Sequence, residues 1–110
     1  MTNAVLEISP AEVGAKRQAG EILRLIDVRE PWENAIASIE NSELIPMRSI
    51  PENLGRLENS DAPLVVYCHH GIRSLSVVDW LRGQGISNCW SMAGGIDLWS
   101  CEIDPRVPRY

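Results

Sequence analysis

Short apolar runs bounded by polar or turn-forming residues recur along this chain and predict β-strands. These runs cover residues 6–9, 22–27, 64–67 and 88–92. The segments between them have apolar residues at helical spacing or helix-start signals, and they cover residues 10–18, 31–37, 47–58 and 74–82. This alternation predicts an α/β fold, with a central, mostly parallel sheet of about five strands and helices on both faces.

Local signals within these segments lead to further expectations. Ser9 is a good N-cap for the first helix, and Glu12 is placed to complete a capping box. Gly20 predicts where that helix stops. In the short helix after the second strand, we expect Trp32 and Ile36 to face inward.

The chain is organised around residues 65–74, which read Val-Val-Tyr-Cys-His-His-Gly-Ile-Arg-Ser. This order predicts a buried strand, a loop and the start of a helix. Unpaired N–H groups at a helix N-terminus converge on one place, and the helix dipole adds partial positive charge there. We therefore expect Cys68 to favour the thiolate form and to be a good nucleophile. Gly71 lets the backbone fold tightly around the sulfur, and Arg73 supplies a cation suited to oxyanions.

This loop resembles the active-site loop of the rhodanese-like sulfurtransferases, in which a cysteine and an arginine bracket four residues. The loop comprises Cys68, His69, His70, Gly71, Ile72, Arg73 and Ser74. Related phosphatases have five intervening residues, so the shorter loop implies sulfur substrates rather than phosphate or arsenate. The segments 27–30 and 93–99 also resemble the family, as does the Pro-rich tail. The resemblance covers nearly the whole chain and implies one rhodanese-like domain over residues 1–110.

Asp27 and Arg29 are expected beside this loop, because ligands and loops collect at the carboxyl ends of parallel strands. The resemblance implies that they brace the loop. The alternative is an ion pair or helix cap of purely structural value. Residues 37–42 keep Ile39 but lack the Gly, His, Pro and second Gly that the family usually has there, and the Leu44-Ile45-Pro46 ending is kept. Asn41 can adopt the turn conformation of a glycine.

Composition narrows the class of protein. The chain has 110 residues and 45% hydrophobic residues, which fits one folded domain rather than a disordered chain. There is no apolar run of membrane-spanning length and no signal-peptide pattern over residues 1–6. Three irregularly spaced cysteines do not suggest a disulfide framework, so we expect a cytoplasmic protein. The net charge of −5 argues against nucleic acid as a partner. A monomer is the simplest expectation.

The resemblance implies a double displacement without metal or organic cofactor. Cys68 would take sulfur from a small anionic donor such as thiosulfate and pass it to cyanide, a thiol or a protein acceptor. Consecutive histidines do not easily converge on one ion, so His69 and His70 are expected to flank the loop mouth, with or without a role in substrate selection. Cys89 is expected to be buried. Cys101 is expected near the surface, where a resolving role is the less favoured alternative.

Two other functions are compatible with the same residues. A rhodanese-like sulfur carrier or regulatory binding module would share the fold, but such relatives commonly lack the cysteine that is present here at Cys68. Phosphatase or arsenate reductase chemistry is disfavoured by the four-residue spacing between Cys68 and Arg73. Transfer of sulfur is therefore the main hypothesis.

Overall fold

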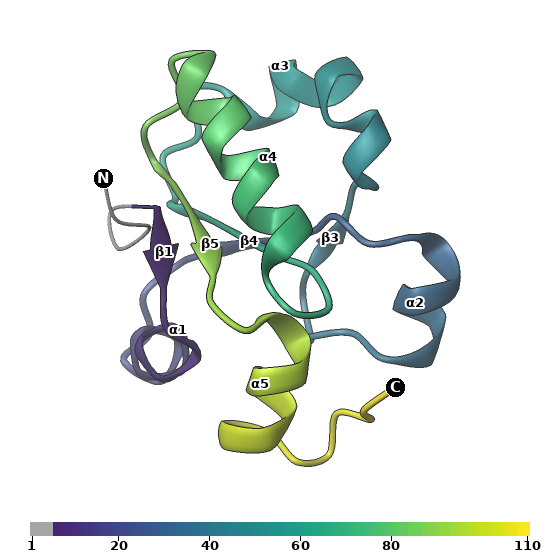
Figure 1. Ribbon diagram of the computed structural model, residues 1–110. Coiled ribbons are helices and arrows are strands. Elements are labelled where there is room, and N and C mark those ends of the chain that lie inside the picture. Colours follow the sequence, from purple (N-terminus) through teal and green to yellow (C-terminus); the bar gives the residue numbers. More distant parts are fainter. Residues whose placement is uncertain (1–5) are drawn as a thin grey trace.

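The computed structural model describes residues 6–110. The expectation about a signal peptide concerned residues 1–6, and all of these except Leu6 lie outside the described residues. Five strands form one sheet, in which every pairing is parallel (Figure 1). The spatial order is β1, β5, β4, β2, β3. The strands are Glu7–Ile8 (β1), Arg24–Asp27 (β2), Glu43–Leu44 (β3), Leu64–Tyr67 (β4) and Cys89–Met92 (β5). The predicted α/β fold is confirmed, and the sheet is wholly rather than mostly parallel.

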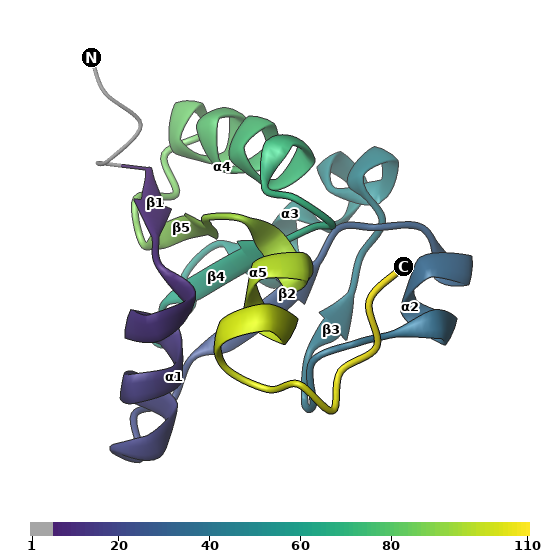
Figure 2. The ribbon, with the colours of Figure 1, turned by 60° about the horizontal axis from the view of Figure 1, so that its bottom comes forward.

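Helices cover both faces of this sheet, with α4 on one face and α1 and α5 on the other (Figure 2). The helices are Pro10–Gln18 (α1), Pro31–Ile36 (α2), Leu54–Leu57 (α3), Ile72–Gly83 (α4) and Gly95–Glu102 (α5), with 3-10 turns Met47–Ser49 (η2) and Pro51–Asn53 (η3). Helix α1 begins as predicted, because the Ser9 hydroxyl accepts a hydrogen bond from the Glu12 N–H at 3.1 Å. No helix within residues 6–110 is long and apolar enough to cross a membrane.

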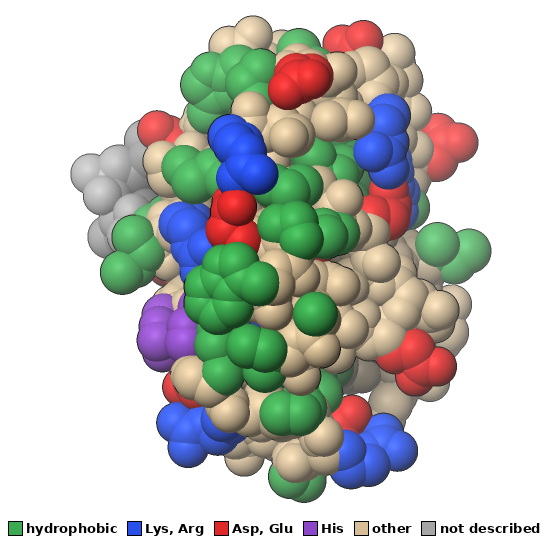
Figure 3. Space-filling model, turned by 90° about the vertical axis from the view of Figure 1, so that its right-hand side faces the viewer, with side chains coloured by type: hydrophobic (Ala, Val, Ile, Leu, Met, Phe, Trp, Pro, Cys, Tyr) green, Lys and Arg blue, Asp and Glu red, His purple; other side chains and the backbone are tan. Residues whose placement is uncertain are grey.

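Two expectations about the helices are wrong. In the segment 47–58 we expected a helix that starts at Ser49 or Ile50 with Pro51 in its first turn. The segment forms two 3-10 turns and a single α-turn instead, because Pro51 has no N–H to continue the turn before it and the side chain of Asn53 donates to the carbonyl of Ser49. Trp32 and Ile36 do not face inward and are 61% and 46% exposed. The buried residue of α2 is instead Glu33. The face on the α2 side accordingly has hydrophobic side chains at its surface (Figure 3).

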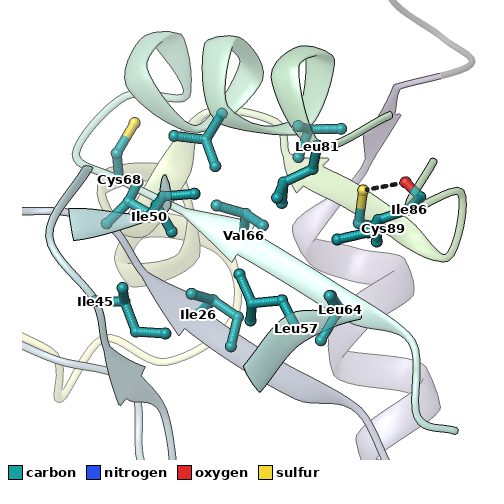
Figure 4. Close-up of a cluster of buried hydrophobic side chains, with 13 residues drawn as sticks. Ile26, Ile45, Ile50, Leu57, Leu64, Val66, Cys68, Leu81, Ile86 and Cys89 are labelled. Carbon is teal, nitrogen blue, oxygen red and sulfur yellow. Dashed lines mark hydrogen bonds between the residues drawn. The ribbon is translucent and has the colours of Figure 1, made fainter. Parts of the chain in front are cut away.

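Strand β4 lies between two hydrophobic clusters, one on each face of the sheet. Both sets of alternating side chains are therefore buried, which explains the uninterrupted apolar sequence of this strand. Leu64 and Val66 point into the cluster beneath α4 (Figure 4). Val65 and Tyr67 point into the opposite cluster, which α1 and α5 cover. Trp99 of α5 belongs to this second cluster. The strand is thus held on both faces up to Cys68, where the loop of residues 68–71 begins.

The first turn of α5 is bound directly to the backbone of that loop. The N–H of Ile96 donates to the carbonyl of Cys68 at 2.9 Å, and the N–H of Asp97 donates to the carbonyl of His69 at 3.1 Å. Gly95 makes this approach possible. Its φ is +62°, and a Cβ there would lie 2.5 Å from the Cys68 carbonyl oxygen and closer still to that of His69. A residue with a side chain could not occupy this position without moving the loop or α5.

We expect Gly95→Ala to destabilise the protein by roughly 2–4 kcal/mol, because the methyl group adds a backbone clash to an unfavourable φ. Gly20→Ala is the matched control, since Gly20 also has a positive φ, +82°, but a Cβ added there would have no neighbouring atom within 4 Å. The control should lose only about 1 kcal/mol. Urea unfolding of both variants measures the difference, and equal losses would show that the contact with the loop does not matter.

Candidate active site

Cys68 follows β4 directly, and its sulfur is surrounded by hydrogen-bond donors. The backbone N–H groups of Gly71 and Ser74 donate to Cys68 Sγ at 3.2 and 3.3 Å. Gly71 has a φ of +98°, which turns the loop back over the sulfur. Helix α4 begins at Ile72, two residues earlier than expected, so Ser74 lies in its first turn. The predicted convergence of loop amides on Cys68 is therefore present.

The cysteine is more enclosed than a freely exposed nucleophile, since only 1% of its surface is accessible. Figure 4 shows its sulfur pointing out of the hydrophobic cluster toward the loop that precedes α4. The protein therefore encloses the sulfur almost completely, and the loop that precedes α4 lies on the side toward which the sulfur points.

Two buried hydroxyl groups extend from the sulfur into the protein. The Cys68 thiol donates to Ser74 Oγ at 3.4 Å, and Ser74 Oγ lies 2.7 Å from Ser91 Oγ. Both serines are fully buried. A hydroxyl can accept from a thiol or donate to a thiolate by rotating its proton, so this chain can serve both states of Cys68. Ser91 was not expected from the sequence, where the only signal is a polar residue inside a buried strand.

Arg73 does not stand free at the loop mouth. Its two terminal nitrogens donate to the two carboxylate oxygens of Glu33 at 2.7 and 2.9 Å. Glu33 also accepts from the N–H of Glu30 at 3.0 Å and from the hydroxyl of Tyr110 at 2.7 Å. The pair with Arg73, together with these donors, lowers the pKa of Glu33 to about 2. Arg73, the cation expected to bind an anion, is thus paired with the buried carboxylate of Glu33, which balances its charge.

Asp27 and Arg29 form a fully buried ion pair at the end of β2. Arg29 donates to the two oxygens of Asp27, with both distances 2.8 Å. It also donates to the carbonyl of Ala37 at 2.6 Å and to the hydroxyl of Tyr110 at 2.8 Å. These contacts hold α2, the segment after it and the C-terminal segment. Asp27 and Arg29 therefore form the ion pair that was one of the two expectations. Tyr110, which binds Arg29, connects this pair to the loop after Cys68.

Tyr110 connects to the loop by stacking on His69. The two ring centroids are 3.9 Å apart with an interplanar angle of 7°, and His70 stacks on the other side of His69 at the same centroid distance. Burial, followed by the effect of His70, lowers the pKa of His69, so the ring is neutral at pH 7. Tyr110 lies in the tail, which the sequence suggested only to be extended.

His69, His70 and Asp97 lie close enough for their ligand atoms to fall within 4.8 Å of one another. The sequence did not suggest that Asp97 would join the two histidines. An imidazole binds metal through a lone pair in its ring plane, and the lone pairs of two stacked rings do not converge. Asp97 is also paired with Arg109 at 2.9 Å. A metal here would have to unstack the rings and displace that arginine.

The remaining cysteines lie as expected. Cys89 is fully buried, and its thiol donates to the carbonyl of Ile86 at 3.3 Å. Cys101 is exposed and lies in the last turn of α5 rather than after that helix. All three cysteines are free thiols. Of the three, Cys68 is the one whose sulfur receives backbone N–H donors among the hydrogen bonds of the described residues.

The sheet is parallel, and at its carboxyl edge a loop that begins with Cys68 leads into the N-terminus of α4. These features define an α/β domain with a cysteine in the loop after a central strand. The rhodanese-like domain family matches residues 9–102, and this chain belongs to that family. The structure of a rhodanese-like domain protein from Staphylococcus aureus is 30% identical, with a TM-score of 0.81 and coverage of 96% of this chain and 98% of that one.

Two sequence relatives are also informative. Thiosulfate sulfurtransferase GlpE of Pseudomonas fluorescens is 37% identical over 84% of this chain and 82% of its own length. The chloroplastic rhodanese-like/PpiC domain-containing protein 12 of Arabidopsis thaliana is 34% identical over 96% of this chain. The present chain spans 38% of the length of that plant protein.

We expect the unfolding free energies of the wild type and Glu33→Gln to converge as the pH falls from about 5 to about 2. The pKa of Glu33 is lowered in the folded protein, so its carboxylate stabilises the fold above its usual pKa of 4.5, and this contribution is lost as the pH falls through about 2. The contribution is on the order of 3 kcal/mol. Urea unfolding at several pH values measures it, and a constant difference between the two proteins would contradict the expectation.

Proposed function

We propose that this protein is a sulfurtransferase that moves a sulfane sulfur from a donor such as thiosulfate to a thiophilic acceptor through a persulfide on Cys68. The observation that supports this most directly is the convergence of the Gly71 and Ser74 N–H groups on Cys68 Sγ. The relatives named thiosulfate sulfurtransferase support the same substrate class.

The proposed first step is attack of the Cys68 thiolate on the outer sulfur of thiosulfate. A bond forms between the two sulfur atoms, the bond between the outer sulfur and the sulfonyl group breaks, and sulfite leaves with the electron pair. Cys68 then holds a persulfide anion, whose charge the loop amides can stabilise. In the second step, cyanide or a thiolate attacks the terminal sulfur, and the Cys68 thiolate is released. Charge and atoms balance in both steps without a cofactor.

The residues have separate roles in this proposal. Cys68 is the nucleophile. The substrate would contact the loop formed by His69, His70, Gly71, Ile72, Arg73 and Ser74. Asp27 and Arg29 act as supporting residues, because their ion pair fixes Tyr110 against His69. The partners are a small sulfur donor and a thiol, cyanide or protein acceptor, and we propose a monomeric, cytoplasmic protein of one domain.

A sulfur carrier or regulatory module without thiosulfate turnover is the second candidate. The burial of Cys68, with 1% of its surface accessible, is the observation that favours it, because slow access would limit turnover of a small donor. The two candidates differ in rate rather than in the bond formed. Phosphatase chemistry receives no support from the loop, since Cys68 and Arg73 are separated by only four residues.

We expect thiosulfate to add one sulfur atom to the wild-type protein and none to Cys68→Ser, as measured by intact mass. Cyanide should remove the added atom and yield thiocyanate. Cys89→Ser and Cys101→Ser are the matched controls, one buried and one exposed, and both should gain sulfur like the wild type. A gain that persists in Cys68→Ser would contradict the assignment of the nucleophile. No gain from thiosulfate or from a persulfide donor would contradict the proposed activity.

A further inference from the structure

Four arginines on the elements around Cys68 are each paired with a carboxylate. The pairs are Arg29–Asp27, Arg48–Glu30, Arg73–Glu33 and Arg109–Asp97. The protein as a whole has a net charge of −5. An anion that approaches the loop therefore meets local charge that is balanced, within a field that repels it. The attraction that remains comes from neutral donors, chiefly the backbone N–H groups of the loop.

Among these pairs, Arg73–Glu33 is the one that contains a residue of the active-site loop. The side chain of Glu33 is 4% exposed, whereas that of Arg73 is 36% exposed. Glu33 cannot turn away easily, because it accepts four hydrogen bonds: two from Arg73, one from Glu30 and one from Tyr110. The carboxylate is thus a permanent part of the mouth of the site, and its charge opposes that of Arg73.

We propose that Glu33 determines which sulfur donors this site accepts, by cancelling the charge of Arg73 and so favouring singly charged donors over doubly charged ones. The proposal rests on the function proposed above. Glu33 acts through Arg73 and is a specificity-determining residue rather than a catalytic one. Glu33 thus favours donors that carry a single negative charge and whose sulfane sulfur is bonded to a carbon-containing group. Glu33 disfavours thiosulfate, which is a dianion.

The physical reason is that a Coulomb energy scales with the charge of the donor. The Glu33 carboxylate repels a dianion twice as strongly as a monoanion at the same position. Removal of its charge therefore helps both donors, but it helps the dianion more. A loss of structure at the loop would instead slow both donors without regard to their charge.

Methanethiosulfonate and thiosulfate form a matched pair of probes, since a methyl group replaces one charged oxygen. With either donor, the Cys68 thiolate bonds to the outer sulfur and the outer sulfur–sulfonyl bond breaks. The electron pair leaves on methanesulfinate in one case and on sulfite in the other. The same persulfide forms in both reactions, so kcat/KM for the two donors can be compared directly.

The experiment measures kcat/KM for both donors with cyanide as acceptor, in the wild type, Glu33→Gln and Glu43→Gln. Glu43 is the control because it forms a similar two-bond pair with Arg24, which lies opposite Leu64 at the far end of the sheet from Cys68. Glu33→Gln should raise the thiosulfate to methanethiosulfonate ratio of kcat/KM about five- to tenfold. Glu43→Gln should leave the ratio unchanged.

An unchanged ratio in an active Glu33→Gln protein would overturn the proposal, while leaving the sulfurtransferase function intact. If neither donor reacts with the wild type, the proposed function itself fails. Should Glu33→Gln not fold, the salt dependence of the wild type tests the same charge balance. Its kcat/KM for thiosulfate should not fall between about 0.02 and 0.5 M salt, because screening weakens attraction only where a net cation is present. A roughly tenfold fall would overturn the proposal.

Discussion

The backbone of Cys68 and His69 is held from two sides, and the rest of the site depends on this constraint. Their carbonyl groups accept hydrogen bonds from the first turn of α5, while the Cys68 sulfur accepts from the N–H groups of Gly71 and Ser74. The loop therefore cannot relax toward solvent without loss of bonds on both sides. A sulfur atom held among fixed donors needs little reorganisation when its charge changes, which is the condition that nucleophilic catalysis requires.

Charged groups, rather than buried apolar side chains, attach α2 beside this loop. Trp32 and Ile36 of α2 point outward, so α2 does not bury the apolar face that its sequence suggests. It is held by Glu33, which binds Arg73, and by contacts from Arg29. Buried ions are costly to desolvate, and they are tolerated here because each makes several hydrogen bonds. Hydrogen bonds fix the orientation of the side chains that make them more strictly than apolar packing does, and Arg73 is oriented in this way by Glu33.

The C-terminal segment belongs to the same arrangement. It runs from α5 back toward α2, as both ribbon views show (Figures 1 and 2). Tyr110 then joins two charged networks, since its hydroxyl accepts from Arg29 and donates to Glu33. Its ring covers one face of His69. Arg29 and Glu33 thus share the hydroxyl group of a residue about 80 positions away in the sequence, so the tail packs beside the loop.

Several features could be predicted from the sequence because they depend on neighbouring residues. The buried run 64–67, the Cys68 loop and the capping residue Ser9 are each local patterns with a direct physical reading. Asn41 also adopts the expected positive φ, of 65°. The break of the helix after Ile50 was predictable in principle from Pro51, whose missing N–H outweighs helical spacing. None of these local patterns determines the order of the strands in the sheet.

Tertiary structure alone decided which charges that are distant in the sequence meet. The sequence by itself determined that Arg73 follows Cys68 at the start of a helix, but not that Glu33 neutralises it from 40 residues away. Nor did it place Ser91 behind Ser74, or Tyr110 against His69. Local propensity acts over one turn of helix or one strand, whereas an ion pair depends on where the chain returns in space. The position of Cys68 in a loop before a helix could therefore be predicted from the sequence, and the balance of charges around that loop could not.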